Sequence, residues 1–211
     1  RATPSPALVK AALINSATDM GVSFIPDPDS EGDVQQVGDT GPVPNNDEGW
    51  GRIDLANLIG SSLRFSYTEQ GTGLRTGQTW EKRVVVSPNE PLKITLVYTD
   101  VPGLPASIPA LVNDLDLEVT GPNGQLYRGN AFLEGESVSG TPVGDRINNV
   151  EAVHLAAPLP GEYLVRIRAV NVAEDTHHRA NVTPEQDFAL VISGDLPNPG
   201  EGMVFFDRAI Y

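Results

Sequence analysis

The chain has 211 residues, of which 39% are hydrophobic and 20% charged, so it can bury a hydrophobic core in one or two domains. Its 21 glycines, its 18 prolines and its few aromatic residues favour short strands and many turns over a helical bundle. The net charge of −14 argues against nucleic-acid partners, the lack of a long apolar run argues against membrane insertion, and the absence of cysteine excludes disulfides and thiolate zinc sites.

The first predicted element is a helix over residues 5–15. Ser5 can cap the first backbone N–H groups, and Pro6 suits the first helical position because its missing N–H would have no partner there. Apolar residues fill two sides of this helix, so it needs a large surface to pack against. The residues between it and the following β region cannot supply that surface. We therefore expect the partner to lie outside the chain, and the chain to be a fragment of a longer protein.

Residues 26–48 are predicted to form a loop, because prolines and glycines recur there and seven acidic residues occur with no basic one. One interpretation is a solvated loop, and the other is a calcium-binding loop. An EF-hand is excluded by the prolines and by the missing acid at the twelfth position. After this loop, Asp54 is placed to cap a short helix over residues 55–59, and residues 60–62 are interpreted as a linker.

From Leu63 onward the apolar residues follow the short alternating pattern of strands, separated by turn residues such as Pro160-Gly161. The runs are residues 63–67, 80–86, 92–99, 115–120, 125–127, 150–155, 163–170 and 188–193. No helix is predicted between residues 64 and 196. The fold class is therefore predicted to be mainly β, with an antiparallel jelly-roll β-sandwich of about eight strands over residues 61–196. Residues 197–211 are predicted to be a linker and a strand, which could open a further β domain.

Several phrases resemble parts of one protein family. Residues 4–17 resemble the second helix after the nucleophile in subtilisin-like serine proteases, and Gly-Trp-Gly-Arg at 49–52 resembles the phrase that closes their catalytic domain. The β region is similar to the jelly-roll domain of bacterial oxidatively stable alkaline subtilases, which is related in architecture to the P domain of proprotein convertases. Its matching phrases are residues 92–100, 111–117, 121–124, 148–151 and 160–163.

This resemblance implies that residues 1–60 are the end of a catalytic domain, a helical remnant of an α/β subtilase fold. None of the phrases that carry the catalytic triad occurs in the chain, so the triad is expected before Arg1 and no catalytic residue is predicted here. The parent would be a secreted serine endopeptidase. Its β domain would stabilise the catalytic domain, bind calcium or position a protein or peptide substrate, and the catalytic domain of the same parent would be its partner.

A group of acidic and amide residues is the strongest candidate for a site. Asp114 and Asp116 lie two residues apart on one predicted strand and so share a face, about 7 Å from each other, where they repel unless a positive charge is close. Asp145 and Asn149 precede the next long strand. Because calcium prefers carboxylate and amide oxygens, we predict a structural calcium site formed by these four residues. The alternative is a set of Asx-turns and solvated acids.

The histidines and aromatic residues give weaker signals. His154 is interpreted as a surface or hydrogen-bonded residue of a strand, and His177 and His178 as part of a solvated loop that could at most bind zinc weakly. A row of aromatic residues, drawn from Trp80, Tyr98 and Tyr127, would indicate a ligand-binding face if the side chains aligned. Trp50 is expected to be a packing anchor of the catalytic domain.

A free-standing secreted module that binds protein or polysaccharide is the alternative function. The packing partner of the first 60 residues distinguishes between the two functions. If they pack against another polypeptide, the protease interpretation is favoured, whereas packing over the β domain of this chain favours the binding module.

Overall fold

The computed structural model describes residues 3–26, 34–39, 41–60, 64–179 and 182–197. Within these residues the chain forms two helices and eleven strands, so the predicted mainly β class is confirmed. The helices are α1 (Pro6–Asn15) and α2 (Leu55–Gly60). The strands are β1 (Val22–Pro26), β2 (Val34–Asp39), β3 (Arg64–Leu74), β4 (Thr79–Val86), β5 (Leu92–Val97), β6 (Asp114–Thr120), β7 (Leu126–Leu133), β8 (Glu136–Ser139), β9 (Val150–Leu155), β10 (Gly161–Asn171) and β11 (Gln186–Gly194). Neither described helix has the length and apolar character needed to cross a membrane.

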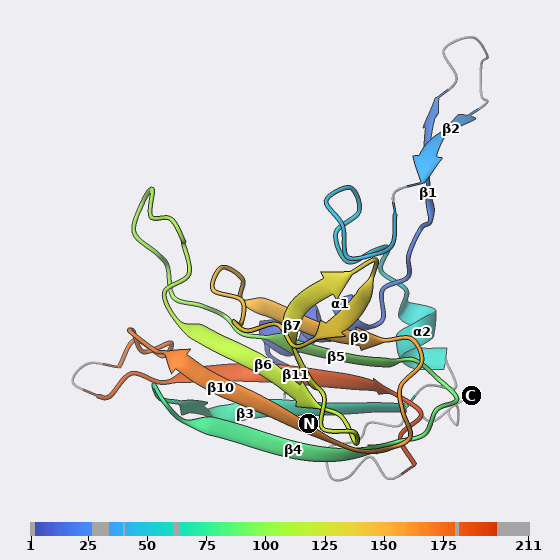
Figure 1. The fold of residues 1–211 in the computed structure, drawn as a ribbon. Helices are drawn as coiled ribbons and strands as arrows, with labels where there is room; N and C mark the ends of the chain where they lie inside the picture. The colour runs from blue at the N-terminus through green and yellow to red at the C-terminus, as the bar shows by residue number, and fades with distance from the viewer. Residues whose placement is uncertain (1–2, 27–33, 40, 61–63, 180–181, 198–211) are drawn as a thin grey trace.

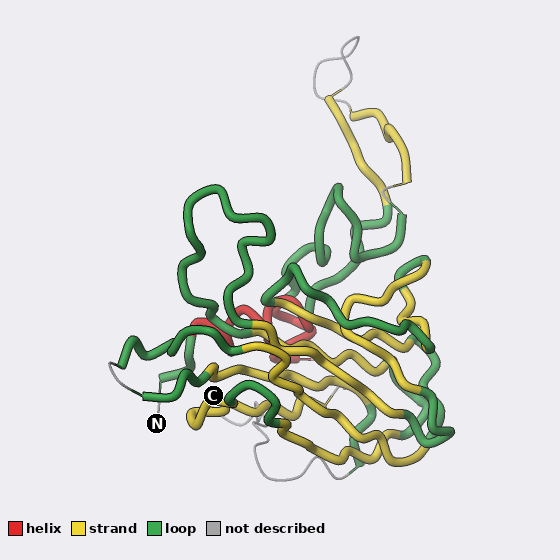
Figure 2. Tube along the Cα trace, turned by 60° about the vertical axis from the view of Figure 1, so that its left-hand side comes forward, coloured by secondary structure: helices red, strands yellow, loops and turns green. Residues whose placement is uncertain are grey.

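Two antiparallel sheets form the body of the molecule (Figures 1 and 2). One sheet has the strand order β4-β10-β6-β7-β8, and the other has the order β3-β11-β5-β9. The alternating residues of β6 and β10 show how the core forms, because Leu115, Leu117 and Val119 are fully buried on one side of β6 and meet Val165 and Ile167 of β10. Apolar residues of β5, β9 and β11 complete this core from the opposite sheet.

Helix α1 lies on the outer face of the four-stranded sheet, against β5 and β11. Ser5 caps it as predicted, accepting a hydrogen bond from the Leu8 N–H at 3.1 Å. Ala7 and Ala11 are buried against Val97 and Val191. The expectation that this helix finds its whole partner outside the chain is therefore wrong. Strands β5 and β11 carry apolar residues on both faces, and the outer face supplies the surface.

The side chain of Asn15 fixes the end of α1 on this sheet. Its Nδ2 donates to the carbonyls of Lys93 and Val191 and to the hydroxyl of Thr95, at distances of 3.1–3.3 Å. A buried amide with three acceptors gives the helix one defined position, since any shift would leave a buried polar group without partners.

The predicted loop over residues 26–48 contains regular structure. Strands β1 and β2 pair as an antiparallel hairpin, which projects from the body in Figure 1. The acidic residues between Asp27 and Asp33 lie outside the described residues, so the calcium-loop interpretation stays a prediction. The strand predicted within residues 197–211 also lies outside them, apart from Pro197.

Trp50 packs differently from the prediction. Its ring makes edge contacts with Phe132 of β7 and His154 of β9, both with centroids 6.1 Å apart. A bridge between Asn45 and Gly49 holds the chain before Trp50, and a bridge between Thr18 and Arg52 holds the chain after it. Gly51 permits the second bridge, because a Cβ there would lie 2.6 Å from the Thr18 carbonyl oxygen. Trp50 is thus an anchor on the sandwich of this chain.

Candidate functional site

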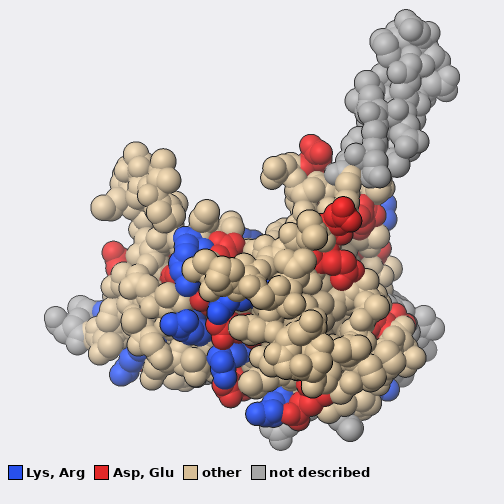
Figure 3. Space-filling view, viewed as in Figure 1, with Lys and Arg blue, Asp and Glu red and all other residues tan. Residues whose placement is uncertain are grey.

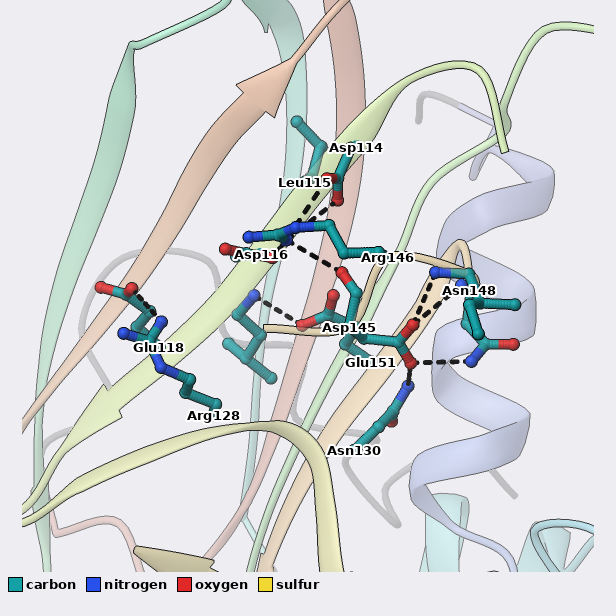
Figure 4. Close-up of polar contacts among 12 residues, drawn as sticks. Asp114, Leu115, Asp116, Glu118, Arg128, Asn130, Asp145, Arg146, Asn148 and Glu151 are labelled. Carbon is teal, nitrogen blue, oxygen red and sulfur yellow. Dashed lines mark hydrogen bonds and ion pairs between the residues drawn. The ribbon is translucent and has the colours of Figure 1, made fainter. Parts of the chain in front are cut away.

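The acidic residues of β6 lie on one face, as the two-residue spacing predicted (Figure 4). Asp114, Asp116 and Glu118 point away from the core, whereas the leucines between them are buried in it. All three acids nevertheless have little exposure to solvent, between 1% and 9%. Their charges therefore need partners within the protein.

Glu118 finds its partners in a row of charged residues across the five-stranded sheet. It accepts from Arg128 of β7 at 2.6 Å and lies 3.5 Å from Arg166 of β10, which in turn bonds Glu81 of β4 at 2.8 Å. These residues are directly opposite one another in the strand register. Figure 3 shows the mixed blue and red side chains on this face. The half-exposed pair of Arg166 and Glu81 contributes little stability, whereas the more buried pair of Arg128 and Glu118 neutralises the Glu118 carboxylate.

Asp114 and Asp116 share a single cation, Arg146. Its Nη1 forms a short contact with Asp116 Oδ1 and lies 3.3 Å from Asp114 Oδ2. Burial raises the pKa of Asp114 to about 6, although the guanidinium of Arg146 acts in the opposite direction. The hydrogen bond to Asp116 raises the pKa of Arg146, which stays charged. The two predicted calcium ligands on β6 are thus brought together around an arginine.

Asp145 and Asn149 are the other two predicted ligands, and both form hydrogen bonds with other residues of the chain. Asp145 accepts from the backbone N–H groups of Ile147 and Asn148, an Asx-turn, and from the side chains of Asn130 and Asn148, at 2.6–3.1 Å. Burial raises its pKa, but these hydrogen bonds outweigh burial, so the pKa lies below its ordinary value. Asn149 donates to the Tyr98 carbonyl at 3.0 Å.

Glu151 is the central residue of this region, and the sequence analysis did not select it. Its carboxylate is completely buried and accepts the N–H of Leu117 at 2.7 Å. Strand β7 pairs with β6 only at residues 118–120, so the N–H of Leu117 has no strand partner there and the Glu151 side chain takes that role. Burial raises the pKa of Glu151 well above its ordinary range, and Asp116 and Asp145 add to the effect.

Two glycines make room for these carboxylates. A Cβ on Gly129 would lie 2.1 Å from Glu151 Oε2, and a Cβ on Gly144 would lie 2.3 Å from Asp116 Oδ1. Gly129, which lies within β7, is the sequence signal that could have pointed to a group such as Glu151, because a glycine within a strand often marks a close approach of another group.

Two acidic oxygens of this region could serve as donors to a metal ion. Asp116 Oδ2 and Glu151 Oε1 are buried and have no hydrogen-bond partner within the described residues. However, the same part of the chain contains no three acidic or histidine side chains placed to hold one metal ion. In this arrangement Asp114 and Asp116 contact Arg146, and Asp145 and Asn149 form hydrogen bonds, so the calcium site at these four residues stays a prediction.

The candidate aromatic row is not formed. Tyr98 is buried, with 1% exposure, and its hydroxyl donates to the Asn113 carbonyl at 3.1 Å. Trp80 packs on Phe188 with ring centroids 5.5 Å apart, and Tyr127 lies against the core. These rings stabilise the sandwich instead of presenting a common face to a ligand.

His154 is a strand residue, as predicted, but it is buried and only partly hydrogen-bonded. The ring lies between Trp50 and Phe132, and its Nε2 has no partner among the described residues. Burial lowers the pKa of His154 to about 3, and the charge of Lys93 adds to the effect. The imidazole is therefore neutral in the folded chain at neutral pH.

The buried His154 predicts a loss of stability in acid. The unfolded chain takes up a proton at this residue as the pH falls below about 6.5, but the folded chain does not until about pH 3. Between pH 7 and pH 5, His154 should thus lower the free energy of unfolding by ~2 kcal/mol. Urea denaturation at both pH values would show it, as the difference between the wild-type chain and His154→Gln. The same change at the exposed His177 should leave the pH dependence unaltered, and a wild-type dependence retained in His154→Gln would contradict the assignment.

Comparison with known proteins gives one distant sequence relative. No family model matches the chain. It is 30% identical over 200 residues to the serine protease/ABC transporter B family protein tagA of Dictyostelium discoideum, in an alignment that covers 90% of this chain and 10% of that protein. The chain thus spans about a tenth of the length of this relative. Among solved structures, Bacillus licheniformis lipase BlEst2 in its propeptide form is similar over 65% of this chain and 23% of that one, with 11% identity and a TM-score of 0.32. That likeness is too low to support an argument.

Proposed function

We propose that the chain is a non-catalytic segment of a subtilisin-like serine endopeptidase. It would pack against the catalytic region that precedes α1 in the same polypeptide and stabilise it. The family resemblance of the helix and β phrases supports this, as does the name of the Dictyostelium relative, which includes a serine protease. The phrases of the catalytic triad do not occur in the 211 residues, so the catalytic groups would belong to the preceding region.

The observation that carries this proposal is the outer side of α1. A helix with apolar residues on two sides needs an apolar partner for each side. The sandwich covers Ala7 and Ala11, but Val9 is 44% exposed, and with Leu13, Trp50 and Ile53 it lines an apolar groove of about 680 Å³. Ile53 is itself 57% exposed. One face of the helix is thus seated on this chain, and the other offers an apolar surface that fits the preceding catalytic region.

The strand order supports the jelly-roll part of the proposal. Going along the chain, β3, β5, β9 and β11 fall in one sheet and β4, β6, β7 and β10 in the other, so that the chain crosses between sheets at almost every connection. The orders β3-β11-β5-β9 and β4-β10-β6-β7 are compatible with an eight-stranded jelly roll to which β8 is added at the edge, and this supports the proposed jelly-roll domain.

Secretion, calcium binding and contact with a protein substrate belong to the same proposal, and each rests on the family resemblance. For calcium, the buried carboxylate oxygens of Asp116 and Glu151 that have no partner are the supporting observation. A calcium ion with oxygen ligands would add to the stability of the folded chain by mass action.

The docking of α1 can be tested in the full-length polypeptide by Val9→Glu. Glutamate is a good helix former and suits the first turns of a helix, so α1 itself should form normally. We expect the half-life of peptidase activity at an elevated temperature to fall by about tenfold, which corresponds to ~1.4 kcal/mol of lost contact. The matched control is Leu159→Glu, because Leu159 is similarly exposed, at 49%, in the turn before β10. Equal half-lives for the two variants would contradict the docking.

A binding module is the alternative function, and a second groove favours it. This groove has a volume of about 500 Å³ and lies between α1, the loop that carries Trp50, and β7. Trp50, Phe132, Asn130 and Asn149 contribute to its lining, a mixture of rings and amides that suits a sugar chain or a peptide. Trp50→Ala should then abolish binding to a glycan array or a peptide library, whereas Val9→Glu, which changes the other groove only, should leave that binding intact.

A further inference from the structure

The loop between β5 and β6 carries two exposed apolar side chains on an uncharged segment. Residues 101–112 contain no charged residue, although 20% of the chain is charged. Ile108 is 97% exposed and Leu104 is 82% exposed, the two highest values for a large apolar side chain in the described part of the molecule. Figure 1 shows this loop standing out from the body between β5 and β6. Apolar side chains that project together from a polar surface are typical of a contact with another protein.

The loop is held in shape, so it can present these side chains without first becoming ordered. The Asp100 carboxylate accepts from backbone N–H groups at both ends of the loop, those of Val101 and Val112, at 2.9 and 2.8 Å. Gly103 lets the two arms of the loop approach closely, since a Cβ there would lie 2.6 Å from the Ala110 carbonyl oxygen. A preorganised loop of this kind loses little conformational entropy when it binds.

A third apolar side chain lies at the same end of the sandwich. Ile147 is 70% exposed, the next highest value after Ile108 and Leu104 among the described residues. It belongs to the loop before β9, and Val150 at the start of β9 pairs with Val97 at the end of β5. The two loops that carry these side chains thus leave the four-stranded sheet at one end. We call Leu104, Ile108 and Ile147 the apolar end.

Helix α1 begins at this end of the sheet too. The Ser5 N–H donates to the Glu69 carboxylate at 2.6 Å. Glu69 of β3 lies opposite Ala189 of β11, which in turn lies opposite Val97 of β5. In both views of the fold, the β5–β6 loop rises above α1 (Figures 1 and 2). A region that precedes α1 in the same polypeptide would therefore join the chain at the end of the sheet from which the loop projects.

Charge disfavours two other occupants of the apolar end. A second copy of the chain would bring the same net charge of −14, and an anionic membrane surface would repel that charge as well. The preceding region differs from both, because its covalent link to α1 keeps it near the apolar end at a high effective concentration.

We infer that the apolar end docks on the region that precedes α1, as a second contact besides the groove along α1. The inference rests on the proposed function, which assigns the catalytic groups to that region. A contact at α1 alone would leave the preceding region free to pivot about the helix. With the apolar end as a second contact, its orientation relative to the sandwich would be fixed.

Photo-crosslinking in the longer polypeptide tests this contact. A benzophenone amino acid replaces Ile108 in one variant and Leu159 in the control. Leu159 is also exposed, at 49%, but it follows β9, whose last residue Leu155 pairs with Leu92 at the opposite end of the four-stranded sheet. After irradiation and digestion, we expect mass spectrometry to find peptides that join position 108 to the region before Arg1, and no such peptides for position 159.

A second measurement uses polar substitutions that leave the folded chain intact, because the replaced side chains are exposed. Leu104→Gln and Ile108→Gln together should shorten the half-life of peptidase activity at an elevated temperature about tenfold, since they remove the apolar contact. Leu159→Gln is the control and should leave the half-life unchanged.

The inference is overturned if position 108 crosslinks to a second copy or to a protein substrate added in solution, or does not crosslink to the preceding region. Equal half-lives for the glutamine variants would also overturn it. Labelling of the nucleophilic serine with a fluorophosphonate keeps this inference apart from the proposed function. A labelled serine before Arg1 without the crosslink contradicts the docking alone, whereas the crosslink without a label supports the docking and contradicts the peptidase.

Discussion

Replacing Asn113 by alanine is expected to lower the free energy of unfolding by about 3–4 kcal/mol, because several buried polar groups would lose their partners together. Asn113 is completely buried next to β6. Its Oδ1 accepts from the N–H groups of Ala173 and Glu174 at 2.9 and 3.1 Å, and its Nδ2 donates to the Glu174 carbonyl and to Gln186 at 2.9 and 2.8 Å. This side chain therefore ties the start of β6 to the segment between β10 and β11.

Urea denaturation would measure the loss. The matched control is Asn171→Ala, since Asn171 is exposed and makes one longer hydrogen bond, 3.3 Å to the Val112 carbonyl. It should cost no more than about 0.5 kcal/mol. Similar losses for the two variants would show that the buried amide of Asn113 has no special role.

Glu151 gives the second large effect, in a comparison of two substitutions. Glu151→Ala leaves the Leu117 N–H without a partner and opens a cavity, so we expect the free energy of unfolding to fall by about 3 kcal/mol at neutral pH. Glu151→Gln keeps a carbonyl oxygen for that N–H and should stay within about 1 kcal/mol of the wild type. Equal losses for alanine and glutamine would contradict the hydrogen-bonding role.

The pH dependence of the same variants has a definite sign. Burial raises the pKa of Glu151, so the folded chain holds a proton that the unfolded chain releases above about pH 4.5. The contribution of Glu151 to stability is therefore complete below that pH and decreases as the pH rises towards its folded pKa. Glutamine does not titrate, so Glu151→Gln should gain on the wild type as the pH is raised from 4 to 8. Parallel stability curves would mean that the pKa of Glu151 is not shifted.

The sequence predicted the parts of the fold that depend on local pattern. The alternation of Asp114, Leu115, Asp116 and Leu117 was enough to place the acids on one face and the leucines in the core. The caps at Ser5 and at Asp54, which accepts from Ala56 at 2.9 Å, were likewise predictable, because capping depends on residues within one helical turn.

The parts that the sequence did not predict depend on contacts between distant segments. Glu151 becomes important only because β7 leaves β6 after a short pairing, and no local pattern shows where that occurs. The contacts of Arg146 with Asp114 and Asp116 join residues some 30 positions apart in the sequence, and no local pattern indicates them. The position of α1 was not predicted because it depends on apolar residues of β5 and β11, such as Val97 and Val191, that lie far from the helix in the sequence.

The packing of α1 and Trp50 supports neither function exclusively. From the sequence we expected that packing of this segment over the β domain would favour a free-standing binding module. The contacts of α1 and Trp50 with the sandwich fulfil that condition. The exposed Val9 and Ile53 favour a further partner on the other side of the same helix. A segment seated between a sandwich and a preceding domain has both properties, which is why we favour the protease segment.

Labelling of the longer polypeptide with a fluorophosphonate, which reacts with the nucleophile of serine hydrolases, tests the proposed function most directly. After digestion, peptide mass spectrometry would locate the label. Our account predicts a labelled serine in the region before Arg1 and no label on any peptide from residues 1–211. A polypeptide that takes up no label, or a label within these residues, would contradict it.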